Sequence, residues 1–338
     1  MKAAVFEKEG VLTVKEVAKP AITRPDQALI EVEACSICGT DVHITSVPAG
    51  YIATPNTVLG HEFCGHIVAL GADVHHLKLG DRVVVNPNNY CGVCDYCRMN
   101  LPNQCEHIEA LGIDYDGAFA KYCCVSGKVA YRISEELPAE LAACVEPLAC
   151  AVNGMHKVRL NPGTSAVVVG SGPIGLMITM LLKSAGVSTI FLLETAPWRI
   201  DFAKKLGIAE VLDPIHEDAR GKILEATRIG ADYVFDVTGS QMPSCVDFVR
   251  KGGQVVLFGV NKKARAQLAQ CEITTKEITV FGTWLANATF PEAIRLLEEK
   301  VIDLTPLVTD VISLSEIHDG LEKLRRGQAV KVIVKPED

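Results

Sequence analysis

The sequence predicts an α/β protein with a doubly wound parallel sheet in its second half and an irregular, barrel-like β domain in its first half. Three observations lead to this prediction. Short β-type runs separated by turn residues fill roughly the first 150 positions, and apolar strands alternate with helices from about residue 160. The chain of 338 residues is also longer than one ordinary core accommodates, so two domains are expected.

Composition and charge exclude several classes of function. Hydrophobic residues make up 49% of the chain and charged residues 22%, the balance of an ordinary globular protein. The net charge of −8 argues against nucleic acid or an anionic membrane as the main partner. No apolar run approaches the ~18 residues of a membrane-spanning helix, and charges appear too early for a signal peptide. Thirteen cysteines fit reduced thiols and metal ligands, so we expect a cytoplasmic protein.

The predicted β domain covers residues 1–150. Residues 28–33, 65–70 and 81–85 are typical of its short strands, and the first residues of the chain also predict a strand. Spacing of this kind favours an irregular barrel over alternating strands and helices.

Four cysteines in this half have a C-x2-C-x2-C-x7-C spacing: Cys91, Cys94, Cys97 and Cys105. Short turns place pairs of thiolates on one face, and the wider loop brings the fourth across, so all four can surround one tetrahedral ion. Because every ligand is a thiolate and no position is left for water, we interpret the lobe as a closed, structural zinc site. A disulfide-bonded loop and an iron–sulfur cluster are the alternatives that the spacing leaves open.

A second set of metal-binding side chains is spread over the same half. Cys38 precedes Gly39, which allows a tight turn around a metal, and His61 and Glu62 follow further along. One soft and two harder ligands are the mixture of a catalytic zinc site with an open position. A hydrogen-bonded structural histidine competes with this interpretation at position 61. The remaining cysteines are expected to face the core: Cys35, Cys64, Cys123, Cys124, Cys144, Cys150, Cys245 and Cys271.

A further carboxylate, Glu146, lies directly before Pro147 near the end of this half. One interpretation is an acid at a helix N-terminus, favoured by the helix dipole and followed by proline at the first helical position. The other interpretation is a metal ligand. The residues alone support both equally.

A dinucleotide-binding unit begins where the pattern changes. Residues 165–169 form an apolar run of the buried parallel-strand type, and Gly170-Ser-Gly-Pro-Ile-Gly175 follows at once. The first glycine permits a tight turn, the second lets a pyrophosphate approach the backbone, and the third lets the helix pack closely on the strand. The residues assigned to the cofactor in this motif are Gly170, Gly172, Pro173, Ile174 and Gly175.

Glu194 ends a second apolar strand at residues 189–193. Its carboxylate can accept both hydrogens of the adenosine ribose hydroxyls and would repel a 2′-phosphate, so we expect NAD(H) rather than NADP(H). Arg199, about one helical turn further, is either a contact to the adenosine ribose or phosphate or a solvated helix residue. Strand, glycine motif, helix, strand and acid in this order are far more specific than GxGxxG alone.

The alternation of strands and helices then continues. Further strands are expected at 210–212, 232–237, 254–258 and 330–334, and helices at 198–206, 216–229, 242–249 and 290–300. The strands at 232–237 and 254–258 end beside glycines at the carboxyl edge of the sheet, where such sheets bind their ligands. Val237 and Gly259 are therefore assigned to cofactor binding.

Taken together, the motifs resemble the zinc-containing medium-chain dehydrogenase/reductase family along nearly the whole chain. The motifs that carry the resemblance are the cysteine lobe, Cys38-Gly-Thr-Asp41, Gly60-His-Glu62, Glu146-Pro-Leu-Ala149 and Gly170–Gly175. The resemblance implies a groES-like catalytic domain at 1–150 with both zinc sites and a Rossmann domain at 151–284 that binds NAD. It also implies that residues 285–338 return to the catalytic domain, and that the chain forms a homotetramer or dimer.

The resemblance also implies roles for the scattered metal ligands. Cys38 and His61 become ligands of a catalytic zinc, and Glu62 is a ligand in some members of the family. Glu146 stands where ordinary alcohol dehydrogenases have a cysteine. Members resembling polyol and threonine dehydrogenases have an acid there, which either binds zinc or holds its water.

Four more residues receive roles from the resemblance. Thr40 lies where a hydroxyl relays the substrate proton, and His43 lies where a histidine passes it to solvent. Asp41 matches an acid that orients the histidine ligand. Lys331 matches a basic residue that contacts the cofactor pyrophosphate.

The implied activity is the NAD-dependent oxidation of a secondary alcohol, with zinc as the Lewis acid. The Glu146 motif resembles polyol dehydrogenases most, with cyclic, amino or phosphorylated polyols among the expected substrates. An L-threonine 3-dehydrogenase and a simple secondary alcohol dehydrogenase are the alternatives. A non-catalytic NAD-binding protein on the same fold is disfavoured, because this chain keeps the ligands that degenerate relatives lose.

Overall fold

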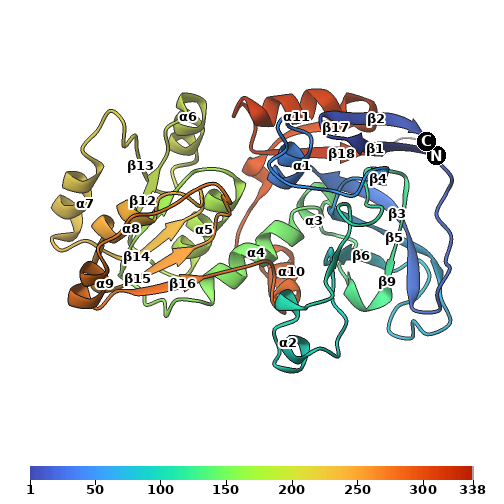
Figure 1. The fold of residues 1–338 in the computed structure, drawn as a ribbon, viewed down its shortest axis with the longest axis horizontal. Helices are drawn as coiled ribbons and strands as arrows, with labels where there is room; N and C mark the ends of the chain where they lie inside the picture. The colour runs from blue at the N-terminus through green and yellow to red at the C-terminus, as the bar shows by residue number, and fades with distance from the viewer. Residues whose placement is uncertain (337–338) are drawn as a thin grey trace. The chain divides into compact units, whose positions relative to one another are not determined.

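A computed structural model describes residues 1–336 and divides the chain into two compact units (Figure 1). Unit 1 consists of Met1–Ala149 and the segment that starts at Ala286, and unit 2 is Cys150–Leu285. Unit 1 is rich in antiparallel strands, and unit 2 contains a parallel sheet whose strands alternate with helices. The predicted α/β class is therefore confirmed. Residues 337 and 338 of the predicted last segment lie outside the described residues.

Unit 1 is organised around the long strand β3 (Gln27–Ser36), which pairs antiparallel with β5 (Glu62–Leu70), β9 and β18. Its largest sheet has the order β10-β6-β5-β3-β18-β17, with β9 also on β3. The register places Ser36 opposite both Glu62 and Ile333, so the carboxyl end of β3 meets two distant segments. Smaller sheets have the orders β2-β1-β4 and β7-β8.

The remaining strands of unit 1 are short. They are β1 (Lys2–Lys8), β2 (Val11–Glu16), β4 (Thr57–Val58), β6 (Arg82–Val85), β7 (Asn88–Asn89), β8 (Glu109–Ala110), β9 (Tyr122–Ser126), β10 (Ala130–Arg132), β17 (Val308–Ser313) and β18 (Lys331–Lys335). The helices are α1 (Gly39–Ile44), α2 (Asp95–Arg98), α3 (Ala139–Ala142), α10 (Phe290–Glu298) and α11 (Ile317–Arg325), and α4 (Val145–Met155) contains the boundary between the units. One apolar cluster joins side chains from β1, β3, β5, β6 and β18, including the fully buried Ile30, Phe63 and Phe119.

The short helix α1 is fixed at both ends. Its N-cap is Cys38, whose Sγ accepts the Thr40 N–H at 3.4 Å, while Asp41 Oδ2 accepts the Cys38 N–H at 2.9 Å. This reciprocal capping box satisfies backbone donors that would otherwise lack partners. At the other end, Arg325 of α11 donates to the carbonyl oxygen of Thr45 at 3.1 Å and to its Oγ1 at 2.7 Å. The helix that carries the predicted proton-relay residues is therefore held in a defined position.

Unit 2 contains a six-stranded parallel sheet with the order β13-β12-β11-β14-β15-β16. In this order the chain builds outward from β11 in both directions, which is the doubly wound arrangement. The elements are β11 (Ser165–Val169), α5 (Pro173–Ser184), β12 (Thr189–Leu193), α6 (Pro197–Leu206), β13 (Glu210–Leu212), α7 (Ala219–Thr227), β14 (Ala231–Asp236), α8 (Met242–Phe248), β15 (Val249–Leu257), α9 (Gln270–Lys276) and β16 (Thr279–Gly282). The strands predicted at 165–169, 189–193 and 210–212 are confirmed with these bounds.

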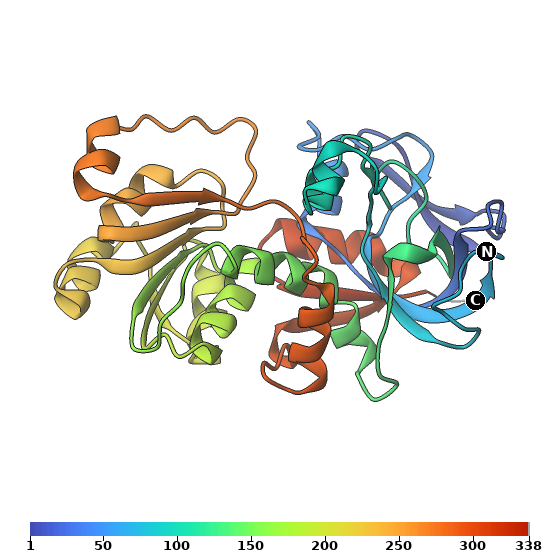
Figure 2. The same ribbon diagram turned by 90° about the horizontal axis from the view of Figure 1, so that it is seen from below.

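Three predictions in unit 2 need correction. The strand predicted at 254–258 is the longer β15, which already begins at Val249 and ends at Leu257. The helix predicted at 216–229 is shorter, because Asp218 caps α7 by accepting the Gly221 N–H at 2.8 Å and so starts the helix at Ala219. Cys271 is exposed, so its predicted place in the core was wrong: α9 buries none of its residues. A segment without helix or strand, residues 258–269, leads to α9 (Figure 2).

The other cysteines predicted in the core divide into two groups. Those that are buried are Cys35, Cys64, Cys123, Cys144 and Cys245. Cys124 and Cys150 are only half-buried, so the core prediction was too strong for them. No helix among residues 1–336 is both long enough and apolar enough to cross a membrane.

Candidate metal and cofactor sites

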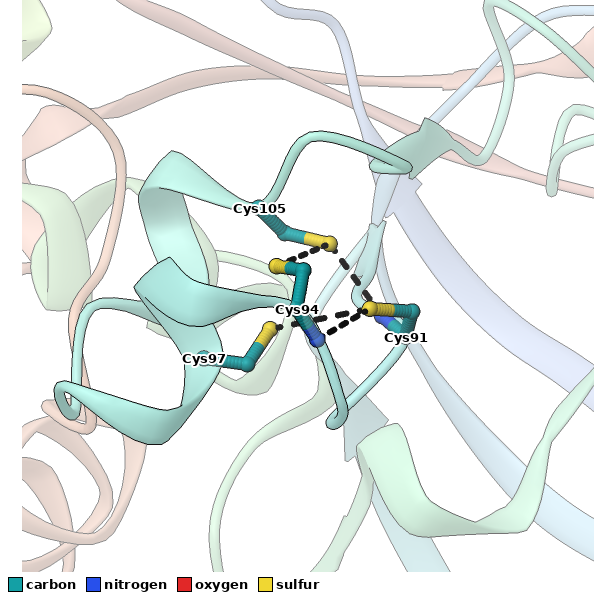
Figure 3. A group of neighbouring side chains, drawn as sticks. All are labelled: Cys91, Cys94, Cys97 and Cys105. Atoms are coloured by element: carbon teal, nitrogen blue, oxygen red, sulfur yellow. Dashed lines mark hydrogen bonds between the residues drawn. The ribbon is translucent and has the colours of Figure 1, made fainter.

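The four cysteines of the lobe turn their sulfur atoms toward one another (Figure 3). Cys91 Sγ lies 4.0 Å from Cys97 Sγ, and Cys94 Sγ lies 3.9 Å from Cys105 Sγ. All four sulfur atoms are within 4.8 Å of one another. A tetrahedron with Zn–S bonds of about 2.3 Å has edges of about 3.8 Å, so these distances fit one closed zinc site.

Backbone N–H groups favour the thiolate at Cys91, whereas burial raises the pKa of the Cys97 thiol in the same lobe. Those of Val93 and Cys94 donate to Cys91 Sγ at 3.4 and 3.3 Å, and they lower the pKa of the Cys91 thiol to about 6. The deprotonated sulfur is the form that binds a metal. All thirteen cysteines are free thiols in the described chain, so the disulfide-bonded loop considered above is not formed.

A second metal-binding group consists of Cys38, His61 and Glu62, with one ligand atom of each within 4.8 Å of the others. Cys38 is the N-cap of α1, Glu62 is the first residue of β5, and His61 directly precedes it. The pairing of β3 with β5 brings these segments together. Three donors, unlike the four of the lobe, leave coordination space for another ligand.

Negative charge is concentrated around His61, which is buried. Burial would lower the pKa of His61, but Asp41, Cys38 and Glu62 raise it well above its ordinary value. Burial raises the pKa of the Cys38 thiol, Glu62 raises it further, and His61 opposes them. A buried group of donors that draws a proton this strongly is also suited to hold a metal cation. The donor set therefore fits zinc.

Asp41 faces the other side of the same imidazole. Its Oδ1 lies 3.7 Å from His61 Nδ1, and among the described residues neither atom has a hydrogen-bond partner. The separation is slightly longer than a hydrogen bond, and a small rotation of the ring would close it. Such a contact would direct Nε2, the other ring nitrogen, toward the metal.

Two side chains hold Glu62, and sequence reasoning connected neither of them to it. Ser36 Oγ donates to Glu62 Oε2, and Lys331 Nζ forms an ion pair with the same oxygen. Burial would lower the pKa of Lys331, but Glu62, Cys144 and Cys38 raise it, so the ammonium stays charged. Ser36 gave no distinct sequence signal, because it is the last residue of β3, a strand that also carries Glu31 and Glu33.

The remaining predicted catalytic residues are placed as follows. Thr40 and His43 lie one turn apart on α1, the first half-buried and the second exposed. Glu146 is buried in the first turn of α4, but it does not belong to the Cys38–His61–Glu62 group. Its role as a zinc ligand stays a prediction.

The glycine motif of unit 2 has the geometry of a phosphate cradle. Gly170 has a φ of +106°, which side chains rarely allow. A Cβ on Gly175 would collide with the Gly170 carbonyl oxygen, so helix α5 can approach β11 only with glycine there. Around Gly172, the N-cap of α5, a Cβ would meet nothing within 4 Å. This open space at a helix N-terminus fits a pyrophosphate. Pro173 and Ile174 form the first turn of α5.

Glu194 follows β12 and is held as a carboxylate. Its Oε2 accepts from Ser171 N at 3.0 Å and Ser171 Oγ at 2.8 Å, and its Oε1 accepts from Thr195 N at 2.7 Å and Ala196 N at 3.0 Å. Burial would raise the pKa of Glu194, but these four donors together lower it. Ser171 lies inside the glycine motif, so Glu194 is fixed against the phosphate cradle. Arg199 on α6 buries its Nε without a partner among the described residues.

The carboxyl edge of the sheet carries the last predicted cofactor residues. Val237 follows β14 and packs beside Gly170 and Gly175. Gly239 and Gly259 lie back to back, because a Cβ on either would collide with the backbone of the other. The turn that follows β14 is organised by the buried Asp236, a residue that the sequence did not single out. The groups that donate to its carboxylate are the N–H of Thr238, Gly239 and Gln241 and the Thr238 hydroxyl.

Comparison with known proteins identifies the family. The family model described as the alcohol dehydrogenase GroES-like domain matches residues 24–135, and the one described as zinc-binding dehydrogenase matches residues 173–299. D-arabinitol dehydrogenase 1 of Uromyces fabae is 34% identical over 343 residues, which cover 99% of this chain and 97% of the relative. The chain belongs to the zinc-containing medium-chain alcohol dehydrogenases.

Two further comparisons place this dehydrogenase within the family. L-threonine 3-dehydrogenase of Caldanaerobacter subterraneus subsp. tengcongensis is 35% identical, over 98% of this chain and 97% of the relative. The solved alcohol dehydrogenase TADH from Thermus sp. ATN1 superposes with a TM-score of 0.93 at 29% identity and covers both chains completely. This dehydrogenase is therefore an oxidoreductase with GroES-like and Rossmann-type domains, as the motifs predicted.

For this dehydrogenase, Cys94→Ala should lower the melting temperature by roughly 5 °C or more, because metal binding by the folded lobe contributes free energy of folding. Scanning calorimetry measures the melting temperature, and elemental analysis measures the zinc that is lost. Turnover per folded molecule should change by less than about twofold. Cys124→Ala, outside the lobe, is the matched control. Unchanged zinc content and melting temperature in Cys94→Ala would contradict the structural site.

Proposed function

We propose that this dehydrogenase holds a structural zinc in the lobe and a catalytic zinc at Cys38 and His61, with Glu62 beside it as a ligand in only some states of the site, and that it oxidises a secondary alcohol with NAD. The second group carries the proposal, because its three donors, of which His61 and Glu62 are buried and Cys38 is half-buried, leave space for a substrate. Unit 1 would then be the catalytic domain and unit 2 the cofactor domain. When bound, zinc supplies Lewis acidity and NAD supplies the hydride acceptor.

The chain's own contribution to the chemistry is to orient the reactants and to move a proton. Thr40, at the start of α1, is proposed to relay the proton of the substrate hydroxyl: its oxygen accepts that proton while its own O–H proton passes on, directly or through water, toward His43. His43, one turn further and exposed, passes the proton to solvent. The capped ends of α1 keep these two side chains on one face of the helix.

The preference for NAD rests on Glu194. Solved relatives of this dehydrogenase include one bound to NADP, from Sinorhizobium meliloti, and one in complex with NADH, from Escherichia coli, so the fold alone does not decide. A carboxylate fixed beside the glycine motif favours ribose hydroxyls and repels a 2′-phosphate. Arg199, with its unpartnered Nε, is proposed to contact the adenosine ribose or phosphate.

We propose a polyol as the substrate class. Relatives named for polyols include sorbitol dehydrogenase of Bacillus subtilis and D-altritol 5-dehydrogenase of Agrobacterium fabrum, at 32% and 33% identity. A D-arabitol-phosphate dehydrogenase of Enterococcus avium, 33% identical, keeps phosphorylated polyols in the class. A buried acid at position 146 suits a substrate rich in hydroxyl groups. L-Threonine is the second candidate, because a threonine dehydrogenase is 35% identical.

A substrate panel tests this proposal. Polyols, amino-polyols, sugar phosphates, L-threonine and simple secondary alcohols are compared by the appearance of NADH absorbance. We expect the highest kcat/KM for a polyol, at least ~10-fold above the best simple alcohol, since each added substrate hydrogen bond contributes about 1 kcal/mol or more. A panel in which L-threonine or a simple alcohol leads would overturn the polyol assignment. Turnover of no alcohol at all would overturn the proposed function.

The location and the assembly of the protein stay predictions. We propose a cytoplasmic homotetramer or dimer, and sedimentation velocity of the zinc-loaded protein measures its assembly. A monomer at micromolar concentration would contradict that part of the proposal.

A further inference from the structure

Lys331, which forms an ion pair with Glu62 of the metal group, occupies a position that does not match its predicted role. Lys331 was expected to contact the cofactor pyrophosphate, yet only 1% of the residue is exposed, and it ranks among the largest fully buried side chains. Its ammonium is paired with Glu62, which is itself 2% exposed. A buried lysine in this chain therefore faces a metal-binding carboxylate.

We propose that Lys331 is a positioning residue of the metal site: its ammonium holds the Glu62 carboxylate away from the zinc and so keeps a coordination position open for the substrate. This inference rests on the catalytic zinc proposed above. It assigns Lys331 to unit 1 chemistry rather than to cofactor binding.

The geometry supports this assignment. Ser36 and Lys331 both bind the same oxygen, Oε2 of Glu62, from neighbouring strands β3 and β18. The Lys331 ammonium and the Ser36 hydroxyl stabilise the negative charge on this oxygen. The carboxylate is then a weaker electron-pair donor to a metal ion. Of the three candidate ligands, Glu62 is the one that forms an ion pair with Lys331. Lys331 therefore determines whether the third candidate ligand, the Glu62 carboxylate, can reach the metal.

Two competing roles for Lys331 predict different results. A cation near zinc weakens metal binding by repulsion whatever residue stands at position 62. A pyrophosphate contact would strengthen NADH binding and leave the metal unaffected. If Lys331 acts only by positioning Glu62, replacing Lys331 should change zinc retention when Glu62 is present and should have no effect when Glu62 is replaced by glutamine. A double-mutant cycle separates these roles.

The test uses the zinc-loaded, full-length protein and four variants. They are Lys331→Met, Glu62→Gln, the double variant Glu62→Gln/Lys331→Met, and Lys331→Arg. Lys335→Met is the matched control, because Lys335 lies on the same strand but is half exposed and paired with Glu140. Zinc loss to a soluble chelator, the visible spectrum after Co²⁺ replacement, and NADH affinity by fluorescence are measured for each.

We expect Lys331→Met to lose its catalytic zinc ~10-fold more slowly, because the freed carboxylate becomes a permanent ligand. Its Co²⁺ spectrum should change accordingly, its kcat should fall, and NADH affinity should stay within about twofold. Glu62→Gln and the double variant should lose zinc at similar rates, within about threefold of the original protein. Lys331→Arg should restore the original metal retention.

Three results would overturn the inference. Faster zinc release from Glu62→Gln, comparable to that of a lost ligand, would show that Glu62 binds zinc in the resting site. Slower zinc release on adding Lys331→Met to the Glu62→Gln background would show simple repulsion. Weaker NADH binding with unchanged zinc retention would restore the pyrophosphate role.

If Lys331→Met does not fold, the zinc-loss rates of Glu62→Gln and of the double variant still distinguish positioning from repulsion. The double variant leaves neither member of the Glu62–Lys331 pair as a buried charge without its partner. Cys38→Ser reports on the catalytic zinc separately, so failure here leaves the proposed function intact.

Discussion

Replacing Cys38 by serine should reduce kcat by ~10³-fold or more, because Lewis acid catalysis by a metal contributes several kcal/mol to the transition state. Serine keeps the size of the side chain but loses the thiolate that holds the ion. NADH affinity should remain within about twofold, since the predicted cofactor residues other than Lys331 belong to unit 2. Elemental analysis should show one zinc lost per chain, and NADH fluorescence measures the cofactor binding.

The matched control is Cys35→Ala. Cys35 lies three residues earlier, is fully buried in β3, and is not part of the metal group. This change removes a thiol from the same neighbourhood, so it should leave zinc content unchanged and kcat within about threefold. Full turnover in Cys38→Ser would refute the catalytic zinc. Equal losses in both variants would point to damaged folding instead.

Replacing Glu194 by alanine should reduce the ratio of kcat/KM for NAD to kcat/KM for NADP by ~10- to 100-fold. Hydrogen bonds to a charged group contribute about 1.5–3 kcal/mol. Alanine removes the proposed bonds from the ribose hydroxyls of NAD and also the repulsion of the 2′-phosphate of NADP. Steady-state kinetics with both cofactors measures the ratio. The melting temperature should also fall, because Glu194 now accepts four hydrogen bonds from its surroundings.

Glu194→Gln separates charge from shape. The amide keeps one accepting oxygen and the volume of the side chain, so local structure should be disturbed less than by alanine. The repulsion of the 2′-phosphate should nevertheless disappear, and KM for NADP should fall. An unchanged cofactor ratio in both variants would refute the role of Glu194.

Local patterns in the sequence predicted most of unit 2. Buried parallel strands such as 165–169 are uninterrupted apolar runs, so their bounds could be read directly. The glycine motif was equally clear, because the φ of Gly170 and the close approach of Gly175 each exclude other residues. The start of α7 was missed because Asp218 caps it, and several residues before that point share the polarity of a helix surface.

Unit 1 was harder to predict, because its architecture depends on pairing between distant segments. The strands at 28–33 and 81–85 were recognisable, but no local signal shows that β18 lies between β3 and β17. The proximity of the four lobe sulfurs could be predicted, since all four cysteines lie within one short stretch. The group at Cys38 was reached mainly through the family resemblance, because its ligands are separated in the sequence.

The contacts that orient the ligands could not be found from sequence. Ser36 is one of several polar residues in β3, and only the register of β3 against β5 places it opposite Glu62. Lys331 ends up at the same carboxylate although it lies far away in the chain. Side chains that act through tertiary pairing leave no periodicity or spacing to read.

The place of β18 in the large sheet also has a consequence for biosynthesis. Residues Cys35 and Ser36 of β3 emerge early from the ribosome, but their partners in β18 are translated only after all of unit 2. Unit 2 is continuous in sequence, so it can fold while unit 1 still has an unpaired strand edge, which is a template for wrong pairing. The nascent chain can therefore fold unit 2 before the large sheet of unit 1 is complete. Glu62 can meet Lys331 only once β18 has been translated, so the ion pair that holds this carboxylate forms late in synthesis.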